Sequence, residues 1–225
     1  MHEPLRGVRI LDLTRLLPGA YATLLLADLG ADVIKIEDPR GGDGMRRVAL
    51  RLPLEERARS GQAGNVYFEL LNRNKRSVTL DLRSAGAGPV LDALIATSDV
   101  LVESFRPSTA RRLGVDGASL RARHPRLICA SISGFGATGP YAERAAHDIN
   151  YQALAGLLAR PSASAKATAD RRSAEREGWS TSSGRAEKNS LILSPLNGEP
   201  VLPGPLVGDI GAAMQSAIAI LGALF

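Results

Sequence analysis

The sequence is poor in cysteine, in aromatic residues and in lysine. The single cysteine in 225 residues, Cys129, excludes an internal disulfide and a metal site built on a cysteine cluster. Aromatic side chains make up only 4% of the chain, which argues against a surface that stacks bases or sugar rings. Only four of the 28 basic residues are lysines, and the charges are spread along the chain rather than gathered in one stripe. Nucleic acid is therefore not an expected partner.

The sequence also shows no feature expected to attach it to a membrane. We expect no apolar run to reach the length of a transmembrane helix, and residues 1–6 contain no apolar core of a signal peptide. Hydrophobic residues make up 44% of the chain and charged residues 23%, values typical of a soluble globular protein. These features predict a cytoplasmic protein without a membrane partner.

Short apolar runs alternate with a helical run near the start of the chain. Residues 8–13 and 32–37 are apolar runs of strand length, while residues 20–29 have helical length and are followed by Gly30. Strand, helix and strand at this spacing predict a βαβ unit with parallel strands and a right-handed crossover. The pattern continues with expected strands at 78–82, 100–103 and 127–133 and an expected helix at 90–97. The sequence therefore predicts an α/β fold with a Rossmann-like, doubly wound parallel sheet.

The chain divides by composition into three expected regions. Residues 1–160 are expected to form the Rossmann-like domain, and residues 161–198 a disordered, low-complexity insertion that is poor in large apolar side chains. Residues 199–225 are expected to form a loop and the start of a linking helix. Because this helical run reaches the end of the sequence without a cap, we expect an N-terminal portion of a longer protein. The turn at 14–20 lacks the three-glycine spacing of a dinucleotide site, which disfavours a nicotinamide or flavin cofactor.

His147 precedes an apolar helical pattern that begins at Asp148. Free backbone N–H groups and the positive end of the helix dipole face outward at such a position and can stabilise a developing oxyanion. A histidine there can move protons near neutral pH. The alternative, which the spacing alone favours, is that His147 or Asp148 simply caps the helix.

Asp209 opens the last helical run, within Gly208–Gly211. An aspartate at a helix start is either an N-cap or, if it acts on a substrate, a base or nucleophile. Lys75 and Arg76 lie in a basic turn that is either a solvated surface or a phosphate cradle. Arg106 follows an expected strand, at the end where α/β sheets bind ligands, so it can meet a phosphate.

Several of these motifs together resemble CoA-transferase family III, also called the CaiB/BaiF family, and within it the α-methylacyl-CoA racemases. The resemblance covers residues 6–160 and 200–225. The matching stretches are GVRILDLTRLLPGAYATLLLADLGADVIKIE, NRNKRSVTLDL, VLVESFRPSTARRLGVD, LICASISGFGATGPYAERAAHDINY and VGDIGAAM.

The resemblance implies roles for two of the candidate residues. In the racemases of this family, the histidine and aspartate that match His147 and Asp209 are the two acid/base groups. In the transferases the same aspartate forms an acyl anhydride, and the histidine is typically absent. His147 therefore favours the racemase branch.

The resemblance also implies how CoA is bound. The family holds the nucleotide and diphosphate of CoA with basic residues of the N-terminal domain. By position the candidates here are Arg40, Lys75, Arg76 and Arg106, with Leu17 and its neighbouring backbone packing on the CoA. The family forms interlocked dimers, so we expect a homodimer of the full-length protein.

Three functions follow as hypotheses. The leading one is inversion of the α-carbon of a 2-methylacyl-CoA by two bases, which needs no metal or redox cofactor because the CoA thioester is the substrate itself. The second is CoA transfer between carboxylic acids through an anhydride on Asp209. The third is a shortened protein that binds CoA or dimerises without catalysis.

Overall fold

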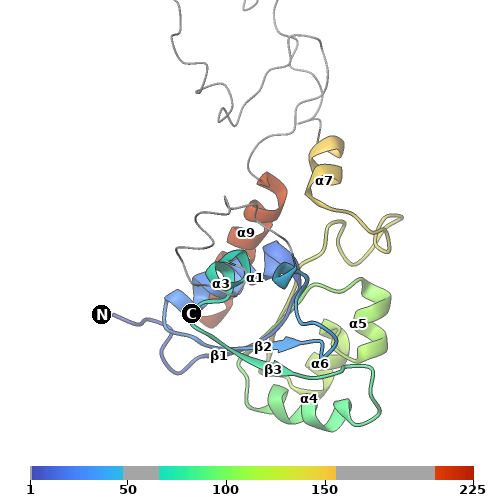
Figure 1. Cartoon of the computed structure of the whole chain (residues 1–225). Coiled ribbons are helices and arrows are strands. Elements are labelled where there is room, and N and C mark those ends of the chain that lie inside the picture. The colour runs from blue at the N-terminus through green and yellow to red at the C-terminus, as the bar shows by residue number, and fades with distance from the viewer. Residues whose placement is uncertain (1, 48–65, 156–205) are drawn as a thin grey trace, which may run out of the picture. The chain divides into compact units, whose positions relative to one another are not determined.

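The computed structural model describes residues 2–47, 66–155 and 206–225 (Figure 1). The described residues divide into two units, one within 1–145 and 209–225 and the other within 146–208. The expected insertion at 161–198 lies outside the described residues. The first unit contains a five-stranded sheet, all of whose strand pairs are parallel, in the order β3-β2-β1-β4-β5. Its strands are β1 (Arg9–Leu13), β2 (Asp32–Glu37), β3 (Lys75–Thr79), β4 (Val100–Glu103) and β5 (Ile128–Ser131).

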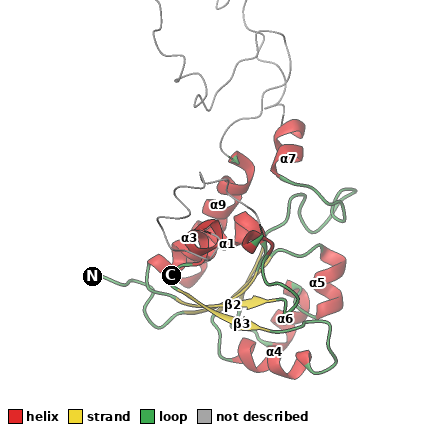
Figure 2. Ribbon diagram, viewed as in Figure 1, coloured by secondary structure: helices red, strands yellow, loops and turns green. Residues whose placement is uncertain are grey.

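Helices cover both faces of this sheet. Figure 2 shows α1, α3 and α9 on one face and α4, α5 and α6 on the other. Their bounds are α1 (Leu16–Asp28), α3 (Val66–Asn72), α4 (Ala87–Ala96), α5 (Pro107–Leu113), α6 (Gly117–Arg123) and α9 (Val207–Leu224); a 3₁₀ turn, η1 (Gly44–Arg46), follows β2. The predicted α/β class with a parallel sheet is confirmed.

The central strands are apolar on both faces because both faces are covered. Ile10 of β1 belongs to a core cluster shared with α1 and α9, while its neighbour Leu11 belongs to a second cluster shared with α4, α5 and α6. Successive strand side chains point to opposite faces, so one continuous apolar run supplies both cores. This alternation explains why β1, β2 and β4 could be recognised in the sequence.

One described helix is long and apolar enough to cross a membrane, judged by length and composition alone. This helix is α9, and the expectation that no apolar run reaches that length is therefore wrong. A mostly buried core helix of a soluble protein also meets this test, whereas 17% of α9 is buried in this structure. Ala213, Ala217 and Ile220 of α9 are buried in the core cluster that also contains Ile10.

The edge strand β3 differs most from its predicted position. The expected strand was 78–82, whereas β3 spans Lys75–Thr79 and pairs with β2 from Val33↔Lys75 onward. Most side chains of β3 are exposed, so the strand itself has no apolar pattern. The predicted range was placed instead on the apolar residues Leu80 and Leu82, which follow the strand. The basic turn expected at Lys75 and Arg76 is thus the start of a strand.

Gly19 of α1 lies against the side chain of Thr14, the residue that follows β1. A Cβ built on Gly19 would lie 2.1 Å from Cβ of Thr14, whose side chain is buried and bonded to Asp12. We expect Gly19→Ala to destabilise the protein by about 1–3 kcal/mol or more, because the buried Thr14 side chain, held by Asp12, has no room to move away from the added methyl group.

Gly88→Ala is the matched control for this substitution. A Cβ on Gly88 in α4 would meet nothing within 4 Å, so alanine should stabilise the protein by about 0.5–1 kcal/mol. Urea unfolding of both variants checks the pair. Equal free energies of unfolding for Gly19→Ala and the wild type would contradict the close packing of Gly19 on Thr14.

Candidate functional site

A pocket of about 230 Å³ opens at the carboxyl edge of the sheet. Its walls come from the ends of β1 and β2, from the segments that follow β3 and β4, and from α5. The strand order reverses between β1 and β4, which is the position where open α/β sheets bind their ligands. The lining residues are Leu13, Arg15, Ile36, Glu37, Asp38, Leu80, Asp81, Leu82, Arg83, Phe105, Thr109, Arg112 and Leu113.

The pocket combines apolar walls with three arginines. Arg15, Arg83 and Arg112 contribute guanidinium groups, and the Arg15 guanidinium lies 5.8 Å from the centre of the Phe105 ring. Guanidinium groups form paired hydrogen bonds to phosphate and also stack on planar rings. The apolar side chains, the Phe105 ring and the arginines can contact a planar base and phosphate groups, while three carboxylates of the lining, Glu37, Asp38 and Asp81, offset part of the positive charge.

Two aspartates hold the arginines at the rim of the pocket. Asp38 accepts hydrogen bonds from Arg40 Nε at 3.1 Å and from Arg83 at 3.3 Å. Asp81 accepts from Arg83 Nε at 3.2 Å and lies 3.8 Å from the Arg40 guanidinium. Hydrogen bonds from the backbone and side chain of Arg40 lower the pKa of Asp38, so it stays ionised. Arg40, a candidate from the sequence, thus lies beside the pocket.

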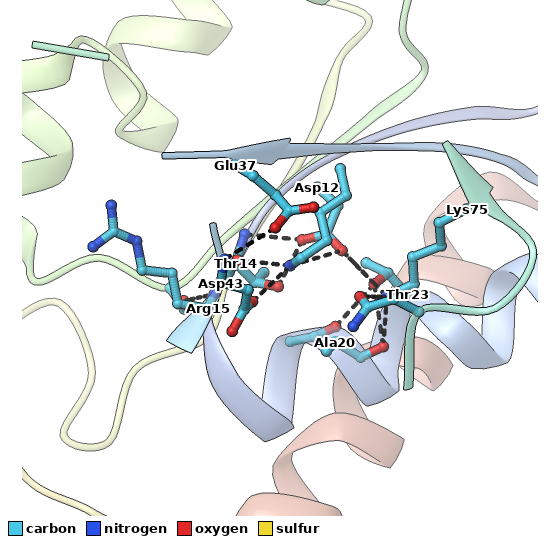
Figure 3. Close-up of polar contacts among 12 residues, drawn as sticks. Asp12, Thr14, Arg15, Ala20, Thr23, Glu37, Asp43 and Lys75 are labelled. Atoms are coloured by element: carbon cyan, nitrogen blue, oxygen red, sulfur yellow. Dashed lines mark hydrogen bonds and ion pairs between the residues drawn. The ribbon is translucent and has the colours of Figure 1, made fainter. Parts of the chain in front are cut away.

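A cluster of buried charges lies below this edge, drawn in Figure 3. Asp12 and Lys35 are fully buried, and Lys35 Nζ lies 3.0 Å from Asp43 and 3.9 Å from Asp12. Burial alone raises the pKa of Asp12, but Lys35, Lys75 and two threonine hydroxyls outweigh it and lower that pKa. Burial likewise lowers the pKa of Lys35, and Asp12 and Asp43 raise it above its ordinary value. Both groups are therefore charged at neutral pH.

The structure places Lys75 and Arg76, the two neighbouring residues expected to bind phosphate, in different surroundings. The Lys75 amine is buried, and it donates to Ala20 O at 2.8 Å and to Asn72 Oδ1 at 3.0 Å. Burial lowers the pKa of Lys75 to about 8. Arg76 is exposed and pairs with Asp32. Neither residue lines the pocket, so their phosphate contacts stay predictions that the geometry does not favour.

Leu17 and Arg106 lie near the same edge. Leu17 is buried in α1, in a cluster with Ala20 and Phe68. Arg106 is exposed at the N-cap of α5, directly after the Phe105 that lines the pocket. Their contacts with CoA stay predictions.

The sequence analysis missed Arg15, Arg83 and Arg112. Arg83 directly follows an expected strand, so the rule that selected Arg106 applies to it equally. Arg112 lies on α5, a helix that the apolar pattern did not predict because only Pro107 and Ala110 are buried. The same rule applies to Arg15, which follows the expected strand 8–13 by two residues, although its place at the pocket depends on the backbone turn before α1.

Asp209 lies in the first turn of α9, as the sequence predicts. Tyr67 of α3 is near enough that the Asp209 charge, together with burial, raises the pKa of the Tyr67 phenol. Ile210 packs against the cluster that contains Phe68. The Asp209 carboxylate, which is half-buried, is therefore close enough to the Tyr67 phenol to act on its charge.

His147 belongs to the second unit and occupies the N-cap position of α7 (Asp148–Leu154). Its backbone N–H donates to Asn150 Oδ1 at 2.8 Å, and its side chain is exposed. Asp148 is buried and accepts a hydrogen bond from Gln152. The expected helix start at Asp148 is confirmed, while the proton-transfer role of His147 stays a prediction.

No cluster of acidic, histidine or cysteine side chains suited to a metal ion occurs within residues 2–47, 66–155 and 206–225. Within the described residues, arginines line the pocket, whereas Asp209 and Tyr67 lie outside its lining.

Comparison with known proteins places the chain in one protein family. A family model described as CoA-transferase family III matches residues 5–225. The chain is 39% identical over 221 residues to a succinate–glutarate CoA-transferase of Agrobacterium fabrum, covering 98% of this chain and 47% of that protein. It is 35% identical to a formyl-CoA:oxalate CoA-transferase of Afipia carboxidovorans, covering all of this chain and 43% of that protein.

A solved structure shares the fold. The crystal structure of a CaiB/BaiF family protein from Brucella suis superposes with a TM-score of 0.75 at 33% identity, covering 100% of this chain and 50% of that chain. The chain thus spans about half the length of the relatives it matches. The two named relatives are transferases, so the expected similarity to racemases in particular is not supported.

Proposed function

The chain belongs to CoA-transferase family III, and from that premise we propose that it moves CoA from an acyl-CoA thioester to a free carboxylic acid. The arginine-lined pocket at the carboxyl edge carries this proposal, because it suits the nucleotide end of CoA. The adenine would lie against Phe105 and Leu82, and the phosphates would meet the arginines. The relatives' names mention succinate, glutarate and oxalate, which supports short dicarboxylates as acids for this chain.

Asp209 is the proposed nucleophile. A carboxylate oxygen attacks the thioester carbonyl and the C–S bond breaks. The CoA thiolate is the leaving group, and the acyl group remains on Asp209 as an anhydride. The thiolate then attacks the aspartyl carbonyl of that anhydride, which releases the first acid and leaves CoA in thioester linkage to Asp209. The second acid reverses the sequence and departs as its own CoA thioester. Every step exchanges one acyl bond for another, so no oxidant or reductant is required.

Racemase chemistry is the second candidate, and it depends on the exposed His147. A racemase must exchange the α-proton of its substrate with solvent, whereas a transferase need not touch it. An incubation in D₂O distinguishes transferase from racemase chemistry. The purified chain is given succinyl-CoA or a 2-methylacyl-CoA together with a second acid. Mass spectrometry should find the new CoA thioester without α-deuterium. Deuterium at the α-carbon without a new thioester would move the protein to the racemase branch.

Arg112→Ala tests the pocket as the CoA site. Loss of one charge-assisted contact should weaken CoA binding roughly 10- to 100-fold in calorimetry. Arg121→Ala is the matched control, because Arg121 also lies in the last turn of a short exposed helix but does not line the pocket. Equal CoA affinities of the two variants would place the nucleotide elsewhere.

A further inference from the structure

The backbone turn between β1 and α1 is held by side chains from three other segments. Lys35 of β2 donates to Thr14 O at 3.0 Å, and Asp43 Oδ1 accepts from Leu16 N at 3.2 Å. Arg15 N donates to Ser104 Oγ, after β4, at 3.0 Å. Three consecutive residues therefore have backbone groups fixed by side chains that are distant in sequence.

Asp12 fixes the same turn from within β1. Its Oδ1 accepts from both the backbone N–H of Thr14 at 2.9 Å and the Thr14 hydroxyl at 2.6 Å. Lys35 links this carboxylate to Asp43, since its amine lies between the two. Asp12, Lys35 and Asp43 form one buried network, which we call the turn network.

The turn is strained. Leu16 has φ of +64°, in the left-handed region that a residue with a Cβ enters at a cost. A non-glycine residue keeps such a conformation only where its surroundings determine it. The bond from Leu16 N to Asp43 and the bonds on Thr14 supply that restraint on either side of Arg15.

The strained turn determines where Arg15 points. Figure 3 shows the Arg15 side chain directed away from the buried cluster, and the guanidinium lines the pocket over Phe105. A relaxed turn would change the direction of Cα–Cβ at Arg15 and move the guanidinium off the Phe105 ring. At the pocket the guanidinium also lies 4.0 Å from Asp38, but the direction in which the side chain leaves the backbone is set by the turn below the pocket.

We propose that Lys35 and Asp43 are positioning residues for CoA binding: they hold the strained turn so that Arg15 faces the pocket. This inference rests on the proposed function of the pocket. Buried ion pairs are often no more stabilising than well-packed apolar side chains. Stability alone therefore does not explain a lysine in the otherwise apolar run VIKI. Its contacts explain it, because Lys35 holds the Thr14 carbonyl and Asp43 in place.

A double-mutant cycle on CoA affinity tests the proposal, with Lys35→Met and Arg15→Ala as its single variants. Each single variant should weaken CoA binding about tenfold in calorimetry. The double variant should bind CoA no more weakly than whichever single variant has the lower CoA affinity. If Lys35→Met already removes the Arg15 contact with CoA, replacing Arg15 as well removes no further contact. A purely structural role of Lys35 gives a double variant weakened about 100-fold, the product of the two effects.

Two further variants separate positioning from loss of stability. Leu5→Ala removes a fully buried side chain that belongs neither to the pocket nor to the turn network, so it should lower the melting temperature without weakening CoA binding. If Lys35→Met fails to fold, Asp43→Asn replaces it. Asparagine keeps an acceptor for Leu16 N but loses the charge beside Lys35, and its effect should also be non-additive with Arg15→Ala.

The outcomes distinguish the two proposals. If Arg112→Ala weakens CoA binding and the Lys35 or Asp43 variant does not, the positioning role is wrong while the CoA pocket stands. Multiplicative losses in the cycle also overturn the positioning role. If none of the pocket variants changes CoA affinity, the assignment of the pocket is wrong, and the positioning role is overturned with it.

Discussion

Asp209→Asn is expected to reduce CoA transfer on the order of 10³-fold or more while leaving CoA binding and stability nearly unchanged. Asp209 is the third residue of α9 rather than its N-cap, so a structural role through the helix dipole predicts a small loss of stability and almost no change in activity. A nucleophilic role predicts near-complete loss, because the neutral amide cannot form the anhydride. The substitution therefore decides between the two readings of an aspartate in the first turn of α9.

Turnover with succinyl-CoA and a second dicarboxylate measures this effect. Asp116→Asn is the matched control, because Asp116 is an N-cap whose side chain accepts from Ser119 N at the start of α6. It should keep full activity. Hydroxylamine added during turnover of the wild type should convert Asp209 to a hydroxamate, which peptide mass spectrometry detects. An active Asp209→Asn protein, or a hydroxamate on another carboxylate, would remove Asp209 from the mechanism.

The sequence predicts the buried part of the fold well and the exposed part poorly. The bounds of β2 and β4 match their expected ranges because these strands are apolar on both faces and are bounded by polar residues. The helices α3, α5 and α6 were not predicted, since each spans seven residues and buries one or two of them. A short helix that buries so little leaves no detectable period in the sequence.

In the candidate site, too, the residues that belong to a local apolar pattern could be predicted, and those placed by tertiary contacts could not. The positions of Asp209 and His147 at helix starts follow from the local apolar pattern, and the structure confirms both placements. The pocket as a whole could not be predicted, because its arginines come from three separate segments, although Arg83 directly follows an expected strand and could have been selected as Arg106 was. Lys35 looks like an interruption of a strand until its partners Thr14 and Asp43 are known. These contacts are set by tertiary structure and leave no local signal.

Asp12→Ala is expected to destabilise the protein by about 3–5 kcal/mol, a large share of the stability of a typical domain. Asp12 is fully buried, and its carboxylate is the anion that Lys35 and Lys75 share. Removing it leaves Lys75 with only neutral acceptors, Ala20 O and Asn72 Oδ1. It also frees the N–H and hydroxyl of Thr14 in a buried position.

The pH dependence of stability tests this account independently. Burial lowers the pKa of folded Lys75 to about 8 from an ordinary value of 10.5. Between these values the unfolded chain binds more protons than the folded one, so the Lys75 contribution to stability rises with pH. Without Asp12 the pKa of folded Lys75 falls further, and the rise should begin at a lower pH.

Lys75→Met should abolish the rise in stability with pH and should recover part of the stability lost in Asp12→Ala when the two changes are combined. Methionine replaces a buried cation, which Asp12→Ala leaves without its anion, by an apolar side chain of similar length. Urea unfolding at pH 7 and pH 9.5 measures the four proteins of this cycle. Additive losses at both pH values would mean that Asp12 and Lys75 stabilise the fold independently. The contribution of Asp12 to stability would then come from its bonds to Thr14 and Thr23 and from its pairing with Lys35.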